Sequence, residues 1–251
     1  MHHAYADQLS SMDSPVHRLD PRTKIACTLL YCAIVVSVPT PRWGLLGLCV
    51  PPLCGALAVS RLPLGYLLKR CLMLSPLVLT VVIFFPLTGT GGARVAAIGP
   101  LEVRTDGLWM GAGIAARFLL TILAVLVLAC TTPFAVLLRG LARFRVPRLF
   151  IMVLSFLYRY LFVLVDECDR MRRARDSRCP RARGVAMAAP GMLAMLFIRT
   201  YDRSDRVYAA MLARGFDGTV RTIGELAFAA RDAAVAAAFA VYFAAVLLLA
   251  R

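Results

Sequence analysis

The sequence predicts an all-α protein, a polytopic membrane helix bundle with a helical cytoplasmic domain. Three observations favour this class. Hydrophobic residues make up 60% of the 251 residues, and charged residues make up only 17%. The apolar residues gather in long runs with almost no charge, and the 29 Lys and Arg residues concentrate between those runs. A soluble domain of this length does not need so much apolar surface, so the chain is assigned to the membrane.

The N-terminal segment, residues 1–20, is polar and is expected in the cytoplasm. Asp20 followed by Pro21 predicts a helix start, with the Asp side chain as N-cap and Pro at the first helical position. The apolar run Ile25–Val38 follows as the first membrane span. This run is short for a bilayer about 30 Å thick, so the span must borrow flanking residues or be partly buried in protein.

Three further spans are expected, and they complete a segment of four transmembrane helices, residues 21–131. Pro51-Pro52 predicts a kink or break in the second span, and Pro76 interrupts the third. A glycine-rich loop, residues 88–105, precedes the longest span. In that span Arg117 can mark a transport pathway or pair with a backbone carbonyl. The three spans are Trp43–Ser60, Cys71–Leu87 and Gly107–Thr131.

Residues 132–231 have a different character, since they hold 18 of the 29 Lys and Arg residues and 8 of the 14 acidic residues. Thr132-Pro133 predicts the start of an amphipathic helix over Phe134–Phe144. Two apolar runs, Leu149–Val165 and Val185–Ile198, each precede a basic helix. We expect these runs to pack beneath the bundle at the cytoplasmic surface.

The alternative for the two apolar runs is a pair of additional membrane spans. It places the seven arginines between Arg170 and Arg183 outside the cell and Arg159 in mid-membrane. The second run is also short and carries a Pro190-Gly191 break. The five-span arrangement therefore assigns residues 132–231 to the cytoplasm.

The distribution of Lys and Arg predicts the orientation. The N-terminal flank, the Arg61–Arg70 connection and the large basic segment fall on one side, which is the cytoplasm. The Pro39–Arg42 turn and the glycine-rich loop fall on the other side. Residues 232–251 contain the fifth span, Ala233–Ala250. Because the chain is assigned to the membrane, we interpret its net charge of +15 as a signal of orientation across the bilayer. No nucleic-acid partner is expected.

Two basic helices, over Asp166–Arg178 and about Asp202–Arg214, end in the same way. Each places Arg, Ala and Arg four residues apart, which stacks them on one helix face. A helix-ending signal follows, Pro180 after the first and Gly215 after the second. These helices are either ordinary amphipathic helices with solvated basic faces or rigid tips that dock in a partner's groove. The stacked residues are Arg170, Ala174 and Arg178 in the first helix, and Arg206, Ala210 and Arg214 in the second.

The first basic helix also predicts two ion pairs with four-residue spacing, Asp166 with Arg170 and Asp169 with Arg173.

The motifs of several kinds of enzyme are absent from this sequence. The only lysines are Lys24 and Lys69, and neither follows a glycine, so no Walker A phosphate loop is present. The three histidines all precede the first span, so neither a histidine general base nor a histidine metal ligand is expected in the membrane. The eight cysteines form no CxxC pair. We expect a non-catalytic chain that itself binds no cofactor or metal.

Several motifs together resemble the transmembrane coupling (T) subunit of energy-coupling-factor transporters, most closely the cobalt branch, CbiQ. The resemblance runs essentially end to end. The segments that carry it are Leu19–Lys24, Thr131–Phe134, Val146-Pro147, Tyr158–Tyr160, Asp166-Glu167, Arg170-Met171 and Ala210–Phe216. The last segment is the most specific, because members of this family carry an Ala-Arg-Gly signature in each of two coupling helices.

The second signature is intact in this chain, and the first keeps only its arginine. The resemblance implies that both signatures contact an ATPase, and that the 132–231 segment is a cytoplasmic coupling-helix domain. The residues of the second signature are Ala213, Arg214 and Gly215, and those aligned with the first are Ser177, Arg178 and Cys179.

The resemblance implies a scaffold subunit of an ATP-driven importer in a bacterial inner membrane. Its partners would be a dimer of ATP-binding subunits, which would carry ATP and Mg²⁺, and a separate CbiM-like membrane subunit that binds the substrate. Cobalt ion is the implied substrate, and a vitamin or nickel importer of the same family is the alternative. Two other classes stay open: a stand-alone channel or carrier that uses Arg117, and a membrane anchor whose basic segment binds anionic lipid.

Overall fold

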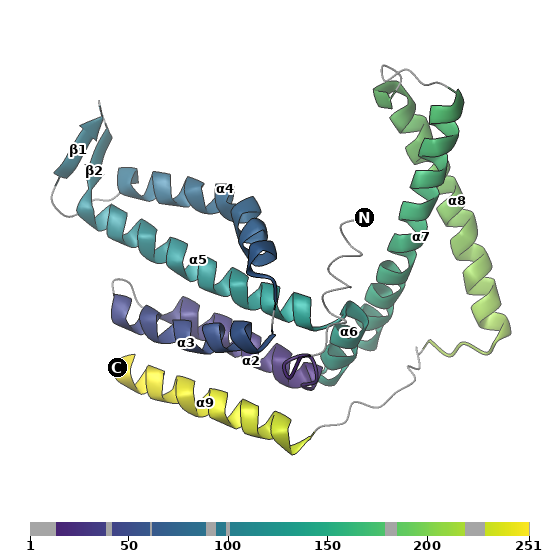
Figure 1. Cartoon of the computed structure of the whole chain (residues 1–251). Helices are drawn as coiled ribbons and strands as arrows, with labels where there is room; N and C mark the ends of the chain where they lie inside the picture. The colour runs from purple at the N-terminus through teal and green to yellow at the C-terminus, as the bar shows by residue number, and fades with distance from the viewer. Residues whose placement is uncertain are drawn as a thin grey trace. The chain divides into compact units, whose positions relative to one another are not determined.

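The computed structural model describes residues 14–38, 42–60, 62–88, 94–98, 101–178, 185–218 and 229–250. The chain forms two compact units, one of residues 1–140 with 226–251 and one of residues 141–225. Helices make up nearly all of the described part of both units (Figure 1). The fold class predicted from the sequence, an all-α membrane helix bundle, is confirmed with the addition of one short hairpin.

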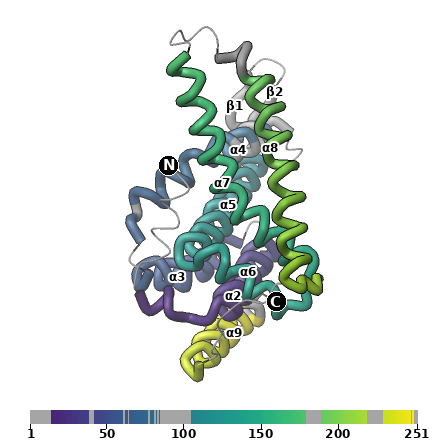
Figure 2. The backbone as a smooth tube through the Cα atoms, turned by 90° about the vertical axis from the view of Figure 1, so that its right-hand side faces the viewer, coloured from purple at the N-terminus to yellow at the C-terminus, as the bar shows by residue number. Residues whose placement is uncertain are grey.

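The first unit is a helix bundle around α5. Helix α5 packs against α2, α3 and α4, while α9 packs against α2 and α3. These helices lie alongside one another in Figure 1, and Figure 2 shows the same bundle turned by 90°. The helices of the bundle are α2 (Pro21–Ser37), α3 (Trp43–Ser60), α4 (Leu64–Thr88), α5 (Thr105–Thr131) and α9 (Ala230–Ala250).

The second unit is a helix pair, α7 (Arg148–Arg178) and α8 (Val185–Ala213), whose members pack against each other. Helix α6 (Phe134–Arg143) spans the division between the two units in the sequence. It confirms the amphipathic helix predicted over Phe134–Phe144.

The apolar core of the bundle joins four helices. Tyr31 of α2 and Phe243 of α9 meet edge to face, with 5.8 Å between their ring centroids. Edge-to-face geometry suits the charge distribution of aromatic rings. The buried residues of this core are Tyr31, Ile34, Val35, Cys49, Leu53, Ala124 and Phe243.

Helix α2 starts as predicted. Asp20 is its N-cap, and the side chain accepts a 2.8 Å hydrogen bond from the backbone N–H of Arg22. Pro21 follows at the start of the helix. The fixed φ of proline suits a first helical turn, where its missing N–H leaves no bond unmade.

A set of buried polar contacts, here called the polar clamp, joins the start of α2 to the end of α5 and the start of α9. The Lys24 Nζ donates to the carbonyls of His17 and Thr131, both at 3.1 Å, and to the Thr132 Oγ1 at 3.3 Å. The Asp232 carboxylate accepts from the backbone N–H groups of Asp20, at 3.1 Å, and Ala229, at 2.9 Å. A buried ammonium is tolerated when it is hydrogen-bonded and has opposite charges nearby, as Lys24 has with its three oxygen acceptors and with Asp20 and Asp232.

Of the kink or break predicted at Pro51-Pro52, the break is wrong, because α3 runs unbroken from Trp43 to Ser60, and the kink stays a prediction. Proline at position 52 cannot donate to the carbonyl four residues back, which is that of Leu48. The Tyr242 hydroxyl donates to that carbonyl at 2.6 Å, and the Tyr31 hydroxyl donates to the neighbouring Cys49 carbonyl at 3.0 Å. The Tyr242 side chain of α9 thus supplies the donor that Pro52 removes from the Leu48 carbonyl, as is common in membrane helices.

Two other local predictions in this unit are corrected. Helix α4 begins at Leu64 and passes through Pro76, so Lys69 and Arg70 are helical and do not belong to a loop. The region predicted as a glycine-rich loop contains an antiparallel hairpin of β1 (Arg94–Ile98) and β2 (Leu101–Arg104). The β-branched residues on either side of Gly99-Pro100 favour two short strands around a turn signal.

Among the described residues, three helices are long and apolar enough to cross a membrane, namely α3, α5 and α7. Helices α3 and α5 match two of the five predicted spans. Helix α7 contains the run Leu149–Val165, which the five-span arrangement places at the cytoplasmic surface. Its length and apolar composition would also allow it to cross the membrane. Length and composition therefore do not decide between five spans and the alternative with two additional spans. The other predicted spans, Ile25–Val38, Cys71–Leu87 and Ala233–Ala250, stay predictions.

Candidate coupling helices

Each predicted basic helix is the second half of a longer helix. Helix α7 joins the apolar run Leu149–Val165 to the basic residues up to Arg178 without interruption. Helix α8 likewise joins the run Val185–Ile198 to the basic segment, and it passes through Pro190. No Gly or Pro separates the apolar from the basic half in either helix, and Pro190 lies near the helix start, where few backbone bonds are lost. The prediction of separate basic helices is therefore wrong.

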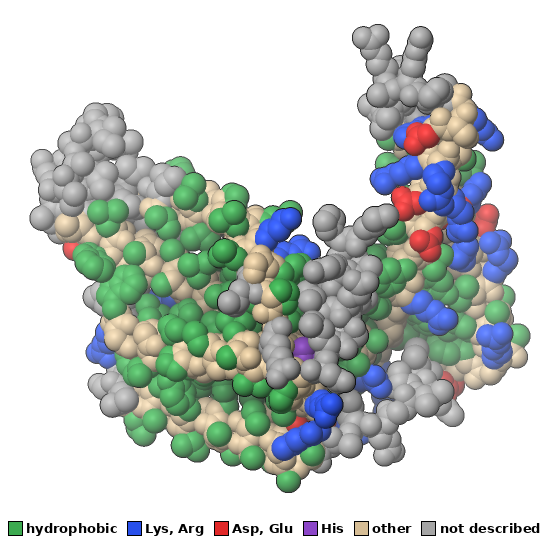
Figure 3. All heavy atoms as spheres, in the orientation of Figure 1, with side chains coloured by type: hydrophobic (Ala, Val, Ile, Leu, Met, Phe, Trp, Pro, Cys, Tyr) green, Lys and Arg blue, Asp and Glu red, His purple; other side chains and the backbone are tan. Residues whose placement is uncertain are grey.

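The helix pair exposes both charge and apolar surface. No side chain of α7, whose residues the structure describes throughout, is buried. Figure 3 shows Lys and Arg side chains gathered on this unit beside hydrophobic ones. Apolar patches on this scale are typical of surfaces that meet a partner or a membrane. The exposed large apolar residues include Leu149, Phe150, Val153 and Leu157 on α7, and Leu193, Phe197 and Ile198 on α8.

Glu167 connects the two helices. One carboxylate oxygen accepts a hydrogen bond from the Arg199 Nη1 of α8, and the other lies 2.9 Å from the Arg170 Nη2 of α7. The hydrogen bond from Arg199 is the main reason that the pKa of Glu167 lies below its ordinary value. The cross-helix partner was missed from the sequence, since Arg199 is 32 residues away and no local spacing indicates the contact.

Two ion pairs within α7 have three-residue spacing. Glu167 pairs with Arg170, and Asp169 lies 3.6 Å from Arg172. The predicted pairs of Asp166 with Arg170 and Asp169 with Arg173 are therefore corrected. Residues three and four apart are both neighbours on a helix, so spacing alone does not choose between them.

The end of α8 is closed by a Schellman motif. The backbone N–H of Phe216 donates to the Met211 carbonyl at 3.1 Å, and that of Gly215 donates to the Leu212 carbonyl at 3.0 Å. Gly215 has φ of +76°, the left-handed conformation that this motif requires at its C′ position. Arg214 is therefore the C-cap residue and is exposed, as is Ala213 before it. The intact Ala-Arg-Gly signature thus presents an arginine at a rigidly ended helix.

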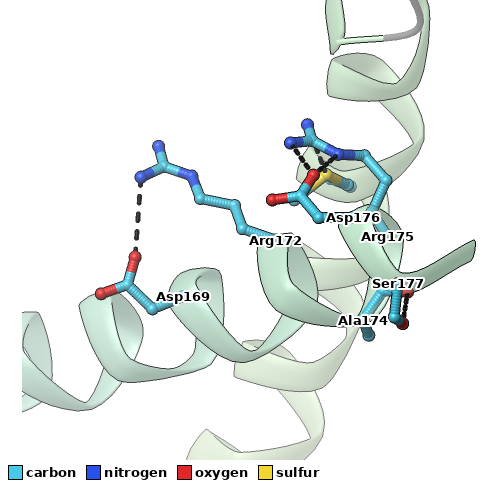
Figure 4. A network of polar contacts seen from close by, with 7 residues as sticks. Asp169, Arg172, Ala174, Arg175, Asp176 and Ser177 are labelled. Carbon is cyan, nitrogen blue, oxygen red and sulfur yellow. Dashed lines mark hydrogen bonds and ion pairs between the residues drawn. The ribbon is translucent and has the colours of Figure 1, made fainter. Parts of the chain in front are cut away.

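The end of α7 is closed differently. The Arg175 guanidinium turns onto the neighbouring Asp176 carboxylate, with a shortest N–O distance of 2.6 Å, and lies 3.9 Å from the Met192 Sδ of α8 (Figure 4). The Ser177 hydroxyl donates to the Ala174 carbonyl at 2.9 Å. Arg178 is the last residue of the helix and is exposed, while Cys179 lies outside the described residues.

The structure places the predicted site residues at two separate ends of the pair. Helices α7 and α8 run in opposite directions, so the two arginine tips lie at opposite ends (Figures 1 and 2). Helix α8, with 29 residues, is about 43 Å long. Two docking points at such a separation fit two separate receptors. The predicted supporting residues Ala174, Arg170, Arg206 and Ala210 are all exposed.

Arg117, the cation of the carrier alternative, closes the end of another helix. Its Nη2 donates to the carbonyl of Val38, the C-cap residue of α2, at 2.6 Å. A cation is favoured at a helix C-terminus, where carbonyl groups lack partners. This contact corresponds to the carbonyl-pairing role that the sequence left open for Arg117.

Within the part of the chain that the structure describes, no group of three or more His, Cys, Asp or Glu side chains is arranged to hold a metal ion.

The chain matches a protein family over residues 12–224, the CbiQ family, described as a cobalt transport protein. It is 30% identical to the energy-coupling factor transporter transmembrane protein EcfT of Heliobacterium modesticaldum, over 84% of this chain and 83% of that protein. It is 29% identical to the EcfT of Bacillus subtilis, with 82% of each chain covered.

A third relative, from Bifidobacterium longum, bears the name of an ABC transporter ATP-binding protein. It is 31% identical over 94% of this chain, which covers 32% of that longer protein. Long apolar helices and a family match over most of the length agree on a multi-pass membrane transport protein. The chain belongs to the CbiQ family and is a transmembrane (T) subunit of the energy-coupling factor transporter type.

Proposed function

We propose that this subunit transmits the motion of ATP-binding partner subunits to a separate substrate-binding membrane subunit, through the Arg178 and Arg214 tips. The partners would bind ATP and Mg²⁺, and this chain would carry no catalytic step. It would act in the bacterial inner membrane with its N-terminus in the cytoplasm, where residues 132–231 would meet the ATPase.

The observation that carries the proposal is the end of α8. The Schellman motif fixes the last turn of the helix, and Arg214 stands exposed at its C-cap. A guanidinium offers a planar fork of donors that matches a carboxylate, so a fixed arginine tip suits a groove lined by acidic side chains. A rigid tip also transmits a movement of its groove to the rest of the helix.

The partners are supported by sequence as well as by geometry. This chain lacks a Walker A motif, so ATP hydrolysis of that kind needs another polypeptide. The Bifidobacterium relative, named as an ATP-binding protein, contains a region similar to this chain within one longer polypeptide. The exposed apolar faces of α7 and α8 suit a hydrophobic partner such as a CbiM-like membrane subunit.

The proposed substrate is cobalt ion, and this rests on the family's description. Nickel or a vitamin remains the alternative, because the relatives named EcfT carry no substrate in their names. The membrane subunit that co-purifies with this chain would bind the substrate, so cobalt binding by that subunit is the direct test.

The coupling role is tested by a pull-down in mild detergent and by cobalt uptake in cells. Wild type is compared with Arg178→Glu/Arg214→Glu, and the bound proteins are identified by mass. We expect the double variant to lose the ATP-binding protein and at least about 90% of uptake, because buried or docked charge reversal costs several kcal/mol.

The matched control is Arg173→Glu/Arg203→Glu, which makes the same charge change on exposed positions of the same two helices. It should keep both the ATPase and uptake. An equal loss of ATPase binding and uptake in the two double variants would mean that only the total positive charge matters, and not the two tips. Retention of the ATPase by Arg178→Glu/Arg214→Glu would refute the coupling role.

A stand-alone carrier is the competing function, and it predicts transport by the purified chain in liposomes without ATP. The contact of Arg117 with the α2 C-cap does not favour it, since that guanidinium already has a structural acceptor. ATP-independent cobalt flux that disappears in Arg117→Gln would reverse this preference.

A further inference from the structure

A cavity of about 790 Å³ lies within the helix bundle. Helices α2, α3, α5 and α9 line it together with residues 14–19. Its size falls in the range of pockets that hold small organic ligands, about 300–1,000 Å³. The apolar residues that line it include Val16, Leu19, Cys27, Tyr31, Leu53, Ala56, Val59, Val127, Leu128, Val235 and Phe239.

The cavity extends along the helices for about the thickness of one lipid leaflet. On α9 its lining runs from Arg231 to Phe239, and on α2 from Thr23 to Tyr31. On each helix the first and last of these residues are eight positions apart, which at a rise of 1.5 Å per residue is about 12 Å. The hydrocarbon of one leaflet is about 15 Å thick, half of a 30 Å core. The deep end is apolar and lies beside the aromatic contact of Phe239 with Phe243, whose centroids are 4.7 Å apart.

The shallow end of the cavity is cationic. Arg18, Lys24 and Arg231 line it, and no Asp or Glu is among the described lining residues. The nearby carboxylates of Asp20 and Asp232 belong to the polar clamp, where backbone N–H groups bond to them. The described lining of this end therefore carries three cationic side chains and no carboxylate.

The three cations differ in their position. Lys24 is only 8% exposed and directs its ammonium to three oxygens of the clamp. Arg18 and Arg231 are exposed. Arg231 uses its Nη2 for the Arg18 carbonyl, at 3.1 Å, and a guanidinium has five N–H donors in all. The two arginines are therefore the side chains placed to meet an anionic group.

We propose that this cavity binds one anionic phospholipid, with an acyl chain between α2, α3, α5 and α9 and its phosphate at Arg18 and Arg231. An apolar slot nearly as deep as a leaflet, with cations at one end and no carboxylate among its described lining residues, is complementary to a chain that ends in an anion. Basic pockets at the ends of membrane helices bind anionic headgroups for this reason. The cytoplasmic leaflet follows from the proposed orientation, while the binding itself does not depend on the coupling function.

The test uses the full-length chain in detergent and measures bound lipid by native mass spectrometry. Dioleoyl phosphatidylglycerol is titrated against dioleoyl phosphatidylcholine, which has the same chains and a neutral headgroup. Wild type should bind phosphatidylglycerol at one molecule per chain and prefer it roughly tenfold. Arg18→Gln/Arg231→Gln should abolish the preference, whereas Arg42→Gln/Lys69→Gln, an equal charge change outside the cavity lining, should keep it.

The acyl chain is tested by filling the cavity. Gly55 of α3 lines it, and a Cβ placed there meets no atom within 4 Å, so Gly55→Leu extends into the slot without a backbone clash. It should lower lipid affinity roughly tenfold, because a methylene-rich contact is lost. Gly47→Leu is the matched control, since Gly47 has equal space, lies on the same helix and is not among the lining residues.

Several results would overturn the proposal. Equal binding of the two lipids by wild type, or unchanged binding in Gly55→Leu, would refute it. Full competition by inorganic phosphate would show an anion site without a chain-binding slot. Loss of the lipid on assembly with the membrane partner, together with weaker co-purification of Gly55→Leu, would assign the cavity to that partner instead.

Discussion

The bundle and the helix pair satisfy their polar groups in opposite ways. In the bundle, the contacts that matter join distant parts of the chain, such as Lys24 with Thr131 and Tyr242 with Leu48. In the pair, the helix ends close on themselves, through Gly215 in α8 and through Arg175 with Asp176 in α7. The long-range hydrogen bonds hold different helices of the bundle together. In the pair, each helix end is closed by contacts between residues near in sequence, and the charged side chains around it stay exposed.

This difference assigns different tasks to the two units. Substitutions in the bundle should act on stability, because they leave buried groups without partners. Substitutions at the ends of the pair should act on partner docking, because the affected side chains are exposed. The comparison of the two units is therefore tested by substitutions that change either the stability of the chain or the docking of its partner, but not both.

The largest effect on stability is expected at Lys24. Lys24→Met removes the donor for the His17 and Thr131 carbonyls and the Thr132 hydroxyl, and it removes the cation beside Asp20 and Asp232. We expect a loss of about 3 kcal/mol in the free energy of unfolding, as when one member of a buried ionic network is removed.

Unfolding in detergent, followed by circular dichroism, measures this loss. Lys69→Met is the control, since it removes the same side chain from an exposed position of α4. Its effect should stay within about 0.5 kcal/mol. If both variants unfold alike, the polar clamp contributes no stability and the bundle does not differ from the pair in this respect.

A smaller effect, confined to one helix end, is expected at Gly215. Its φ of +76° is unfavourable for any residue with a Cβ, although a Cβ there meets no atom within 4 Å. Gly215→Ala should therefore destabilise the last turn of α8 by about 1 kcal/mol through backbone strain alone. Amide hydrogen exchange in that turn should rise about fivefold, and retention of the ATP-binding protein should fall.

The control for this variant is the same substitution inside α8, at Gly191. A Cβ at Gly191 also meets nothing within 4 Å, and its backbone is helical. Gly191→Ala should slow exchange, since Ala favours a helix interior over Gly by up to about 1 kcal/mol. Exchange that changes in the same direction in both variants would contradict the special role of Gly215.

Features that depend on adjacent residues were predicted correctly from the sequence. The Asp20-Pro21 helix start and the Gly215 helix end each rest on a few neighbouring residues, and both are confirmed. Of the kink or break predicted at Pro51-Pro52, the break is absent, and the donor that replaces the lost bond to the Leu48 carbonyl comes from Tyr242 on another helix. No local pattern encodes such partners.

The candidate site follows the same rule. The spacing placed Arg178 and Arg214 at helix ends, but it could not show that the two ends lie at opposite ends of one helix pair (Figures 1 and 2). The spacing also could not predict the hydrogen bond from Arg199 to Glu167, because this contact is created by the packing of α7 on α8. The docking role of both tips stays a prediction for the pull-down described above.

The smallest effect is expected at Glu167, whose contact with Arg199 joins α7 to α8. Glu167→Gln keeps the size of the side chain and removes the charge that Arg170 and Arg199 share. Glu167 is partly buried, but both arginines are exposed to solvent. Ion pairs screened by solvent contribute little, so uptake should fall by no more than about threefold.

A double-mutant cycle with Arg199→Gln separates the cross-helix bond from other effects of each charge. If Glu167 and Arg199 fix α7 against α8, the double variant should take up substrate as fast as either single variant. Asp169→Asn serves as control, because Asp169 pairs only within α7, with Arg172. Additive losses for Glu167 and Arg199 would show that the two tips do not depend on this contact.

The pH dependence of the same contact has a definite sign. Because the pKa of Glu167 in the folded chain lies below its ordinary value of 4.5, the bridge is complete above that value and is lost only as the pH falls below it. Uptake by wild type and by Glu167→Gln should therefore keep a constant ratio from pH 5.5 to pH 8. A ratio that changes within this interval would mean that another group titrates, and that Glu167 is not the link that holds the coupling helices together.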